Sequence, residues 1–320
     1  MVTRKAFRYS LRLKTPVRWK GIDLAYREGV LLQESETGQV DRWADAAPLP
    51  GFSSDSLEEV IDCLPAWAAG TLPDAERVPP ALAWALRCLQ VSEPFGVTEV
   101  PTAALLSGDP GDILAQCMEL NGSFCTAAKL KIGKDEPEAD AALVRAVRST
   151  LGPDVTLRLD ANRAWTLEQA QLLEAALGDV DFAFLEEPVR TPTALRAFDA
   201  VTRLPLALDE SLVEGEVSLD DWSNVRAVVL KPMLLGAALD GWLERASAAG
   251  LQSVFSAAFE SGVGLAHIAR LADPNCPAGL DTWRWLSNDL LAEPLRFAEG
   301  GVTVPASLSV RPDQLIPLVF

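Results

Sequence analysis

Five short apolar segments between residues 128 and 232 each carry a charged residue where a core strand normally has an aliphatic one. They read Ala128-Lys129-Leu130-Lys131-Ile132, Leu157-Arg158-Leu159-Asp160-Ala161-Asn162, Phe184-Leu185-Glu186-Glu187-Pro188, Leu206-Ala207-Leu208-Asp209-Glu210 and Val228-Val229-Leu230-Lys231-Pro232. A buried charge is costly unless it is paired with an opposite charge or bound to a metal. We therefore interpret these segments as the strands of a catalytic metal site.

The overall composition is that of a globular protein. The chain has 320 residues, of which 49% are hydrophobic and 23% charged. Its net charge of −17 argues against nucleic acid as a partner, because phosphate backbones bind basic surfaces. A small anionic substrate remains compatible if the basic residues gather at one site. We find neither a long apolar run nor a secretory signal, and expect a cytoplasmic protein, monomeric or homo-oligomeric, with no membrane partner.

Cysteine and histidine usage limits the kind of metal. The five cysteines show no CxxC spacing, and His267 is the single histidine. Neither a zinc site of the usual kind nor a Ser-His-Asp triad is therefore predicted. A bound metal must be held by carboxylates, which favours Mg²⁺, with Mn²⁺ as a possible substitute.

The chain divides into two regions of different pattern. Residues 1–98 predict an α+β domain, with strands near 5–14 and 29–33 and helices near 55–69 and 79–91. From 99 to 300, strands alternate with amphipathic helices, which predicts parallel pairing and a (β/α) barrel. The expected strands are 102–106, 127–132, 155–161, 182–186, 205–209, 225–231, 252–257 and 278–282. The extended tail, 301–320, is expected to pack with the first domain.

Charged residues fall at the C-terminal ends of the predicted strands, where (β/α) barrels carry their active sites. Asp160, Glu186 and Asp209 end three adjacent strands, about one βα unit apart. Their carboxylates are therefore expected to converge at the barrel mouth, where a divalent cation removes their mutual repulsion. The alternative is three unrelated loop acids that face water.

Three lysines surround this acidic group. Lys129 and Lys131 lie two residues apart on one strand, so both side chains are expected inside the barrel. Lys231 ends the sixth strand, on the far side of the mouth. We expect crowding and desolvation to lower the lysine pKa values, which would suit one lysine to act as a general base. Surface lysines that happen to follow strands are the alternative.

Taken together, these motifs resemble the muconate-lactonizing subgroup of the enolase superfamily. The matching motifs are Lys129-x-Lys131, Asp160-x-Asn162, Glu186-x-Pro188, Asp209-Glu210-Ser211 and Lys231-Pro232. Enzymes of that superfamily use a Lys or His base with Mg²⁺ that stabilises an enediolate. The resemblance implies an α/β fold of the modified TIM-barrel type, (β/α)7β, at residues 99–300, with a capping domain at 1–98.

Further stretches are similar to the short proteobacterial o-succinylbenzoate synthases. They are residues 48–53, 158–165, 184–188, 256–262 and 279–282. This resemblance implies a lyase of menaquinone biosynthesis that dehydrates 2-succinyl-6-hydroxy-2,4-cyclohexadiene-1-carboxylate to o-succinylbenzoate. Ala257 and Ala258 depart from the family pattern, which has more serines there, so backbone N–H groups would hold more of the succinyl group.

The resemblance also implies roles for individual residues. Asp160, Glu186 and Asp209 would hold Mg²⁺. Lys131 would remove the proton α to the carboxylate, while Lys129 and Lys231 stabilise the anion. Expected at the substrate are Asn162, Arg158, Ser256, Ser261 and Gly262, although a packing ion pair is an equally good role for Arg158. Glu187 and Glu210 would support the ligands or pair with the lysines, and residues 19–28 would form a mobile lid.

Two other functions remain open on the sequence. A racemase of N-acylamino acids or an epimerase of dipeptides would use Lys131 and Lys231 on opposite faces of its substrate. A catalytically inactive barrel that serves as a binding module is the second alternative, although every motif of the site is intact.

Overall fold

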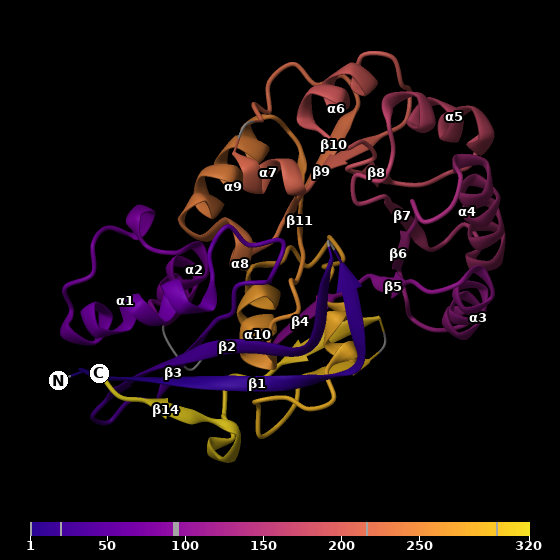
Figure 1. Ribbon diagram of the computed structural model, residues 1–320. Helices are drawn as coiled ribbons and strands as arrows, with labels where there is room; N and C mark the ends of the chain where they lie inside the picture. The colour runs from indigo at the N-terminus through magenta and orange to yellow at the C-terminus, as the bar shows by residue number, and fades with distance from the viewer. Residues whose placement is uncertain (1, 20, 92–95, 216, 299) are drawn as a thin grey trace.

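The described strands form three sheets in the computed structural model, which describes residues 2–19, 21–91, 96–215, 217–298 and 300–320 (Figure 1). One sheet has four strands in the order β14-β1-β2-β3. A parallel sheet has seven strands in the order β11-β10-β9-β8-β7-β6-β5. The smallest has the order β12-β13-β4.

The four-stranded sheet is built on a long antiparallel hairpin of β1 (Val2–Trp19) and β2 (Ile22–Glu36). β3 (Arg42–Ala46) pairs with β2, and β14 (Ile316–Leu318) pairs with β1. Two helices follow β3 in the chain, α1 (Leu57–Ala69) and α2 (Pro80–Leu89). α1 begins at a capping box, in which Ser56 and Glu59 each bond the other's backbone N–H.

The parallel sheet consists of β5 (Ala104–Leu106), β6 (Ala127–Lys131), β7 (Thr156–Asp160), β8 (Phe184–Glu186), β9 (Leu206–Leu208), β10 (Val225–Leu230) and β11 (Gln252–Phe255). The helices that alternate with these strands are α3 (Pro110–Leu120), α4 (Pro137–Leu151), α5 (Leu167–Leu177), α6 (Pro192–Asp199), α7 (Glu210–Glu214), α8 (Pro232–Leu235), α9 (Leu239–Ala248) and α10 (Gly262–Leu271). Figure 1 shows the sheet curled, with α3 to α6 along its outer side.

Both faces of the parallel sheet are buried. Leu157 and Leu159 of β7 belong to the main hydrophobic core, while Arg158 and Asp160 face the opposite side. On that inner side a separate apolar cluster consists of Phe184, Ala207, Ala227, Val229, Val254 and Cys276. Strands covered on both faces need apolar residues throughout, which explains the nearly continuous apolar runs in the sequence.

The strand predicted at 278–282 is wrong for the described residues. Ala278 and Gly279 make only isolated parallel bridges, to Thr102 and Ser256. A 3-10 helix, Asp281–Trp285, follows directly. The Asp281 carboxylate accepts the backbone N–H of Leu105 at 2.8 Å, so a side chain takes the place of a ladder bond at this edge.

The tail contributes strands to two different sheets. β12 (Arg296–Ala298) and β13 (Gly301–Val304) form a small antiparallel sheet with β4 (Thr98–Pro101). β14 instead extends the first sheet beside β1. Short 3-10 helices occupy Ala75–Arg77, Gly236–Ala238 and Pro312–Gln314.

The segment expected to form a mobile lid, residues 19–28, is for the most part a strand. Lys20 lies outside the described residues, and residues 22–28 belong to β2, paired along their length with β1. The strand pattern is obscured in the sequence because Arg27 is buried whereas Tyr26 is 52% exposed. Near the tip of this hairpin, Val17 and Arg18 line the main cavity.

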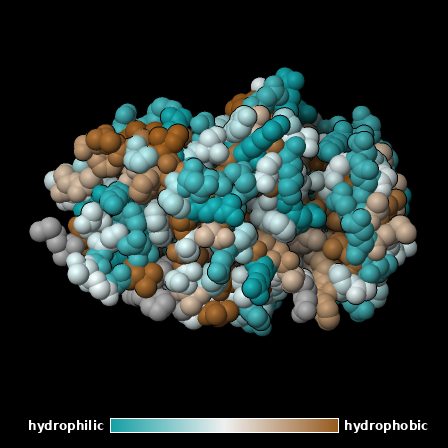
Figure 2. Space-filling model, turned by 90° about the horizontal axis from the view of Figure 1, so that it is seen from below, coloured by the Kyte–Doolittle hydropathy of each residue, from teal (hydrophilic) through white to brown (hydrophobic). Residues whose placement is uncertain are grey.

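Hydrophilic and hydrophobic residues are mixed on the face seen in Figure 2. Figure 2 shows one face, on which hydrophobic residues form small, separate patches among hydrophilic ones. Over the part of the chain that the structure describes, no helix combines the length and the apolar character that a bilayer crossing requires.

The buried histidine predicts a pH-dependent stability. His267 of α10 is 4% exposed, its Nε2 lies 2.8 Å from the carbonyl oxygen of Trp43, and burial lowers its pKa to about 4. The unfolded chain therefore binds more protons than the folded one between about pH 4 and 6.5. Stability consequently decreases as the pH is lowered through that window. We expect a loss of about 2 kcal/mol from this group between pH 7 and pH 5. Urea unfolding at both pH values measures it, and His267→Gln, which keeps a donor, should show a correspondingly smaller loss.

Candidate active site

Three carboxylates at the C-terminal ends of adjacent strands form the centre of the site. Asp160 ends β7, Glu186 ends β8 and Asp209 directly follows β9. The parallel register sets Asp160 beside Lys131 on one side and Glu186 on the other. All three acids are buried, with exposed fractions of 1% or less. The sheet order therefore places these lysines and acids on consecutive strands.

The charge of these carboxylates is compensated by the lysines. Lys129 Nζ lies 2.7 Å from Asp160 Oδ2 and 2.8 Å from Glu186 Oε1. Lys131 Nζ donates to Asp160 Oδ2 at 2.5 Å and to Asn162 Oδ1 at 2.6 Å. On the other side, Lys231 pairs with Asp209 Oδ2.

The predicted direction of the lysine pKa shifts is wrong for two of the three residues. Burial on its own would lower the pKa of Lys129, but Asp160, Glu186 and Asp209 raise it above its ordinary value. The same holds for Lys231. Burial lowers its pKa, but the opposite effect of Asp209 and Glu210 is larger, so the pKa is raised overall. Lys129 also lowers the pKa of Lys231, but the paired carboxylates outweigh this effect and burial, and so decide the sign.

Glu187 holds the acidic strand ends in place. Its Oε1 accepts the backbone N–H groups of Asp209 and Ser211 at 3.0 and 2.9 Å. Its Oε2 accepts Arg163 Nε at 3.0 Å. Glu187 is fully buried and has a φ of +40°, a backbone conformation that non-glycine residues seldom adopt. The expected supporting role thus has a geometric basis, with Arg163 rather than a lysine as the charge partner.

Glu210 and Asn162 connect the acids to the lysines. Asn162 Nδ2 donates to Glu210 Oε1 at 3.0 Å, and the Asn162 backbone N–H donates to Asp160 Oδ1 at the same distance. Burial, with Asp209 adding to it, raises the pKa of Glu210 to about 7. Asn162 thereby bridges Lys131 and Glu210 at the rim of the acidic group.

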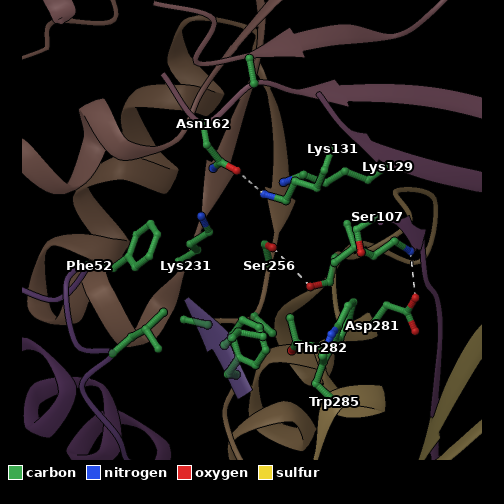
Figure 3. A pocket seen from close by; sticks show the side chains of 18 of the residues that line it. Phe52, Ser107, Lys129, Lys131, Asn162, Lys231, Ser256, Asp281, Thr282 and Trp285 are labelled. Carbon is green, nitrogen blue, oxygen red and sulfur yellow. Dashed lines mark hydrogen bonds between the residues drawn. The ribbon is translucent and has the colours of Figure 1, made fainter. Parts of the chain in front are cut away.

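A cavity of roughly 510 Å³ opens above the lysines. Its floor includes Lys129, Lys131, Lys231 and Asn162. Its walls include Phe52, Ala257, Phe259, Thr282 and Trp285. Figure 3 shows the side chains of Lys129, Lys131 and Lys231 pointing into one side of this space, with Phe52 beside Lys231 and Trp285 on the opposite side. A small molecule with a carboxylate toward the lysines and an apolar ring between the walls fits such a cavity.

Three predicted substrate-binding residues lie elsewhere. Arg158 is 4% exposed on the inner side of the sheet, where Nη1 donates to the Pro277 carbonyl at 2.7 Å. Ser261 is fully buried and bonded to Asp45, and the Gly262 N–H donates to Asp289 Oδ1 at 2.7 Å. None of the three lines the cavity. Ser256 does, and its hydroxyl donates to the Gly279 carbonyl at 3.2 Å.

Sequence reasoning missed several residues of the cavity and its support. Lys134 lines the cavity just past the end of β6, and that position after a predicted strand was the available signal. Phe52 was included only within the similar stretch 48–53, without a role. Arg163, which bonds Glu187, Ser211 and Glu214, lies in the similar stretch 158–165 but was likewise given no role.

The donor set suits a hard divalent cation. Its three carboxylates offer only oxygen atoms, are shielded from water, and attract the ammonium of Lys129 between two of them. Within the described ranges, no three His, Cys, Asp or Glu side chains are already arranged as ligands of one ion. The chemistry therefore fits Mg²⁺, with the lysine ammonium groups as stand-in cations.

Removing the Glu187 side chain should destabilise the fold. Glu187→Ala leaves the Arg163 guanidinium without its buried partner and two backbone N–H groups without an acceptor, so we expect a loss of about 3 kcal/mol in urea unfolding. Glu28→Ala is the matched control, because Glu28 is 48% exposed and pairs with Arg8 at 3.3 Å. Its loss should stay below about 1 kcal/mol. Equal losses in the two variants would contradict the assigned role of Glu187.

Comparison with known proteins extends over nearly the whole chain. Residues 112–314 match the model of the enolase C-terminal domain-like family, and residues 1–92 match that of the MenC N-terminal domain. The o-succinylbenzoate synthase of Vibrio cholerae serotype O1 is 35% identical over 296 residues, which cover 86% of this chain and 88% of the relative.

Solved structures show the same architecture. The o-succinylbenzoate synthase of Thermosynechococcus elongatus, complexed with Mg in the active site, superimposes with a TM-score of 0.75 at 28% identity, over 90% of this chain and 96% of that one. The L-Ala-D/L-Glu epimerase of Bacillus subtilis has a TM-score of 0.77 at 18% identity, over 96% and 98% of the two chains, and shows the fold alone. The chain belongs to the o-succinylbenzoate synthase family of the enolase superfamily.

Proposed function

We propose that this chain is an o-succinylbenzoate synthase, a hydro-lyase that dehydrates 2-succinyl-6-hydroxy-2,4-cyclohexadiene-1-carboxylate. The observation that carries the proposal is the cavity floor, where Lys129, Lys131 and Lys231 lie above three buried carboxylates. The relatives that share 35% identity over most of their length bear this name. A small carboxylate substrate is consistent with a basic cavity in a chain whose net charge is −17.

The chain's own residues account for the proton transfers. As the neutral amine, Lys131 takes the proton α to the ring carboxylate onto the lone pair of Nζ, with Asn162 fixing its direction. The C–O bond to the ring hydroxyl then breaks, the ring becomes aromatic, and the same Lys131 returns the proton, so that water leaves. Lys129 and Lys231, each with 13% of the side chain exposed, stabilise the anionic charge electrostatically. The apolar walls hold the ring in position.

Asp160, Glu186 and Asp209 would hold a Mg²⁺ ion. Their oxygen-only donor set supports this assignment, as does the Mg in the Thermosynechococcus elongatus relative. When bound, the ion supplies Lewis-acid stabilisation of the substrate carboxylate. Mn²⁺ has the same ligand preferences and is proposed as a substitute.

We also infer how the chain is divided. The isolated bridges of Ala278 and Gly279 reach towards both edges of the seven-stranded sheet, which supports a closed (β/α)7β-type barrel at about 99–300. The four-stranded sheet with α1 and α2 would be the capping domain of residues 1–98. The pairing of β14 with β1 supports assigning the end of the tail to it.

The base assignment predicts a severe loss in Lys131→Ala. General-base catalysis typically contributes about 10²–10⁴-fold, so kcat should fall by at least about 100-fold while the fold is retained by circular dichroism. Lys5→Ala, at an exposed position of β1, is the matched control and should keep full activity. Turnover of Lys131→Ala near that of the unmodified protein would rule out Lys131 as the base.

Metal removal should abolish activity and lower stability. We expect o-succinylbenzoate formation to stop with EDTA and return with Mg²⁺, because the three carboxylates then lose and regain their ion. Mg²⁺ present at about 100 times its Kd should stabilise the fold by about 2.7 kcal/mol in thermal unfolding. An inactive binding module would show neither response. Asp209→Asn should lose the Mg²⁺-dependent shift in Tm.

A racemase would behave differently in the same preparation. Lys131 and Lys231 both reach the cavity, which is the observation that keeps this second function open. Incubation with an N-succinylamino acid in D₂O reveals it by deuterium incorporation at the α carbon. Exchange without o-succinylbenzoate formation would favour the racemase over the synthase.

A further inference from the structure

A buried polar cluster lies between the four-stranded sheet and the loop that leads from β11 into α10. Its members are Tyr9 of β1, Arg27 of β2, Asp45 of β3, and Glu260 and Ser261 of the loop, and each is at most 1% exposed. Asp45 is its centre. Asp45 Oδ1 accepts the Tyr9 hydroxyl at 2.8 Å, and Oδ2 accepts both the Ser261 hydroxyl and the Ser261 backbone N–H, at 2.7 and 3.0 Å.

The loop bonded by Asp45 is a wall of the substrate cavity. Ser256, Ala257, Ala258 and Phe259 line the cavity, directly before Glu260 and Ser261 in the chain. Glu260 turns back on this wall, because its Oε2 accepts the Ala258 N–H at 2.5 Å. Phe259 has a φ of +63°, so the wall depends on a backbone conformation that surrounding contacts must enforce.

The cluster has no space in which to shift. A Cβ on Gly264 would lie 3.0 Å from Asp45 Oδ2 and 2.6 Å from Glu260 Cβ. A Cβ on Gly29 would lie 2.4 Å from the Tyr9 hydroxyl oxygen. Glycines at these two positions let the backbones close tightly around Asp45 and its partners.

The same cluster also bonds a second segment that leads to the cavity lining. Arg27 Nη1 donates to the Pro48 carbonyl at 2.7 Å, and Nη2 donates to the carbonyl of Ala47. These carbonyls begin the loop that carries Leu49 and Phe52 into the cavity. Arg27 and Asp45 thus fix two cavity walls from neighbouring strands of one sheet.

We propose that Asp45 is a positioning residue for the substrate: its bonds to Ser261 set the place of the 256–259 wall relative to the four-stranded sheet. Asp45 does not line the cavity and takes no part in proton transfer. Residues 256–259 line the cavity but are not among the groups assigned to proton transfer, so we expect displacement of this wall to weaken binding of the ground state and transition state alike. This inference rests on the proposed function in one respect: the kinetic test uses the substrate of that function.

The test compares Asp45→Ala with a matched buried carboxylate. We expect Asp45→Ala to raise KM for the cyclohexadiene carboxylate by about tenfold while kcat stays within about twofold. Asp199→Ala is the control, because Asp199 is 4% exposed and also accepts two backbone N–H groups, of Ser223 and Asn224, each at 2.8 Å. It should lower Tm and leave KM unchanged, since these residues lie outside the cavity lining.

Two further variants keep the proposal testable if Asp45→Ala does not fold. Asp45→Asn keeps an acceptor for Ser261 and a donor towards Tyr9, so its KM should stay within about twofold of the unmodified value. Ser261→Ala removes one of the two bonds to Asp45 and should raise KM by about threefold. Unchanged KM in Asp45→Ala or Ser261→Ala, or an equal rise in Asp199→Ala, would overturn the proposal.

Hydrogen exchange separates this inference from the proposed function. The amides of 258–261 should exchange at least about tenfold faster in Asp45→Ala than in the unmodified protein, and at an unchanged rate in Asp199→Ala. This readout needs no substrate. An unmodified protein without synthase activity would refute the proposed function alone, whereas unchanged exchange at 258–261 would refute the role of Asp45.

Discussion

The compensation of three buried carboxylates by three ammonium groups is the constraint on which the rest of the structure depends. Asp160, Glu186 and Asp209 are shielded from water, and each has a lysine nitrogen within hydrogen-bonding distance. The lysines hold the pKa values of Asp160 and Asp209 below their ordinary range, whereas burial and the neighbouring Asp160 raise the pKa of Glu186. The parallel register supplies the pairing, because it sets Lys131, Asp160 and Glu186 side by side on neighbouring strands.

Around this charged centre, polar side chains bond backbone groups at several points where a neighbouring strand would normally do so. Glu187 ties the ends of β7, β8 and β9 together through Arg163, Asp209 and Ser211. Asp281 and Arg284 bond the N–H and the carbonyl of Leu105, at the edge of the parallel sheet. Precise placement of reacting groups requires this kind of support from buried, hydrogen-bonded neighbours. Strand periodicity thus determines the parallel sheet, and these side chains hold the ends of its strands and its edge strand in place.

The sequence was sufficient for the features that follow from periodicity. The two-residue spacing of Lys129 and Lys131 predicts their shared face, and the βα spacing predicts three acids on adjacent strands. It was insufficient where distant segments meet. Ser261 is bonded to Asp45, 216 residues away in the chain, so no local pattern shows that it is turned from the cavity. The predicted direction of the lysine pKa shifts was wrong for a related reason. The sign of each shift depends on which charges the strand register brings within 3 Å of the ammonium.

The pairing of β14 with β1 has a consequence for how the chain folds as it is synthesised. Ala6, Phe7 and Arg8 find their partners at Leu318, Pro317 and Ile316, among the last residues of the sequence. Until those residues leave the ribosome, the outer edge of β1 remains unpaired, although the hairpin of β1 and β2 is complete. An unpaired strand edge is a template for association with other chains. Pairing therefore protects the edge at Ala6, Phe7 and Arg8 only after residues 316–318 have been synthesised.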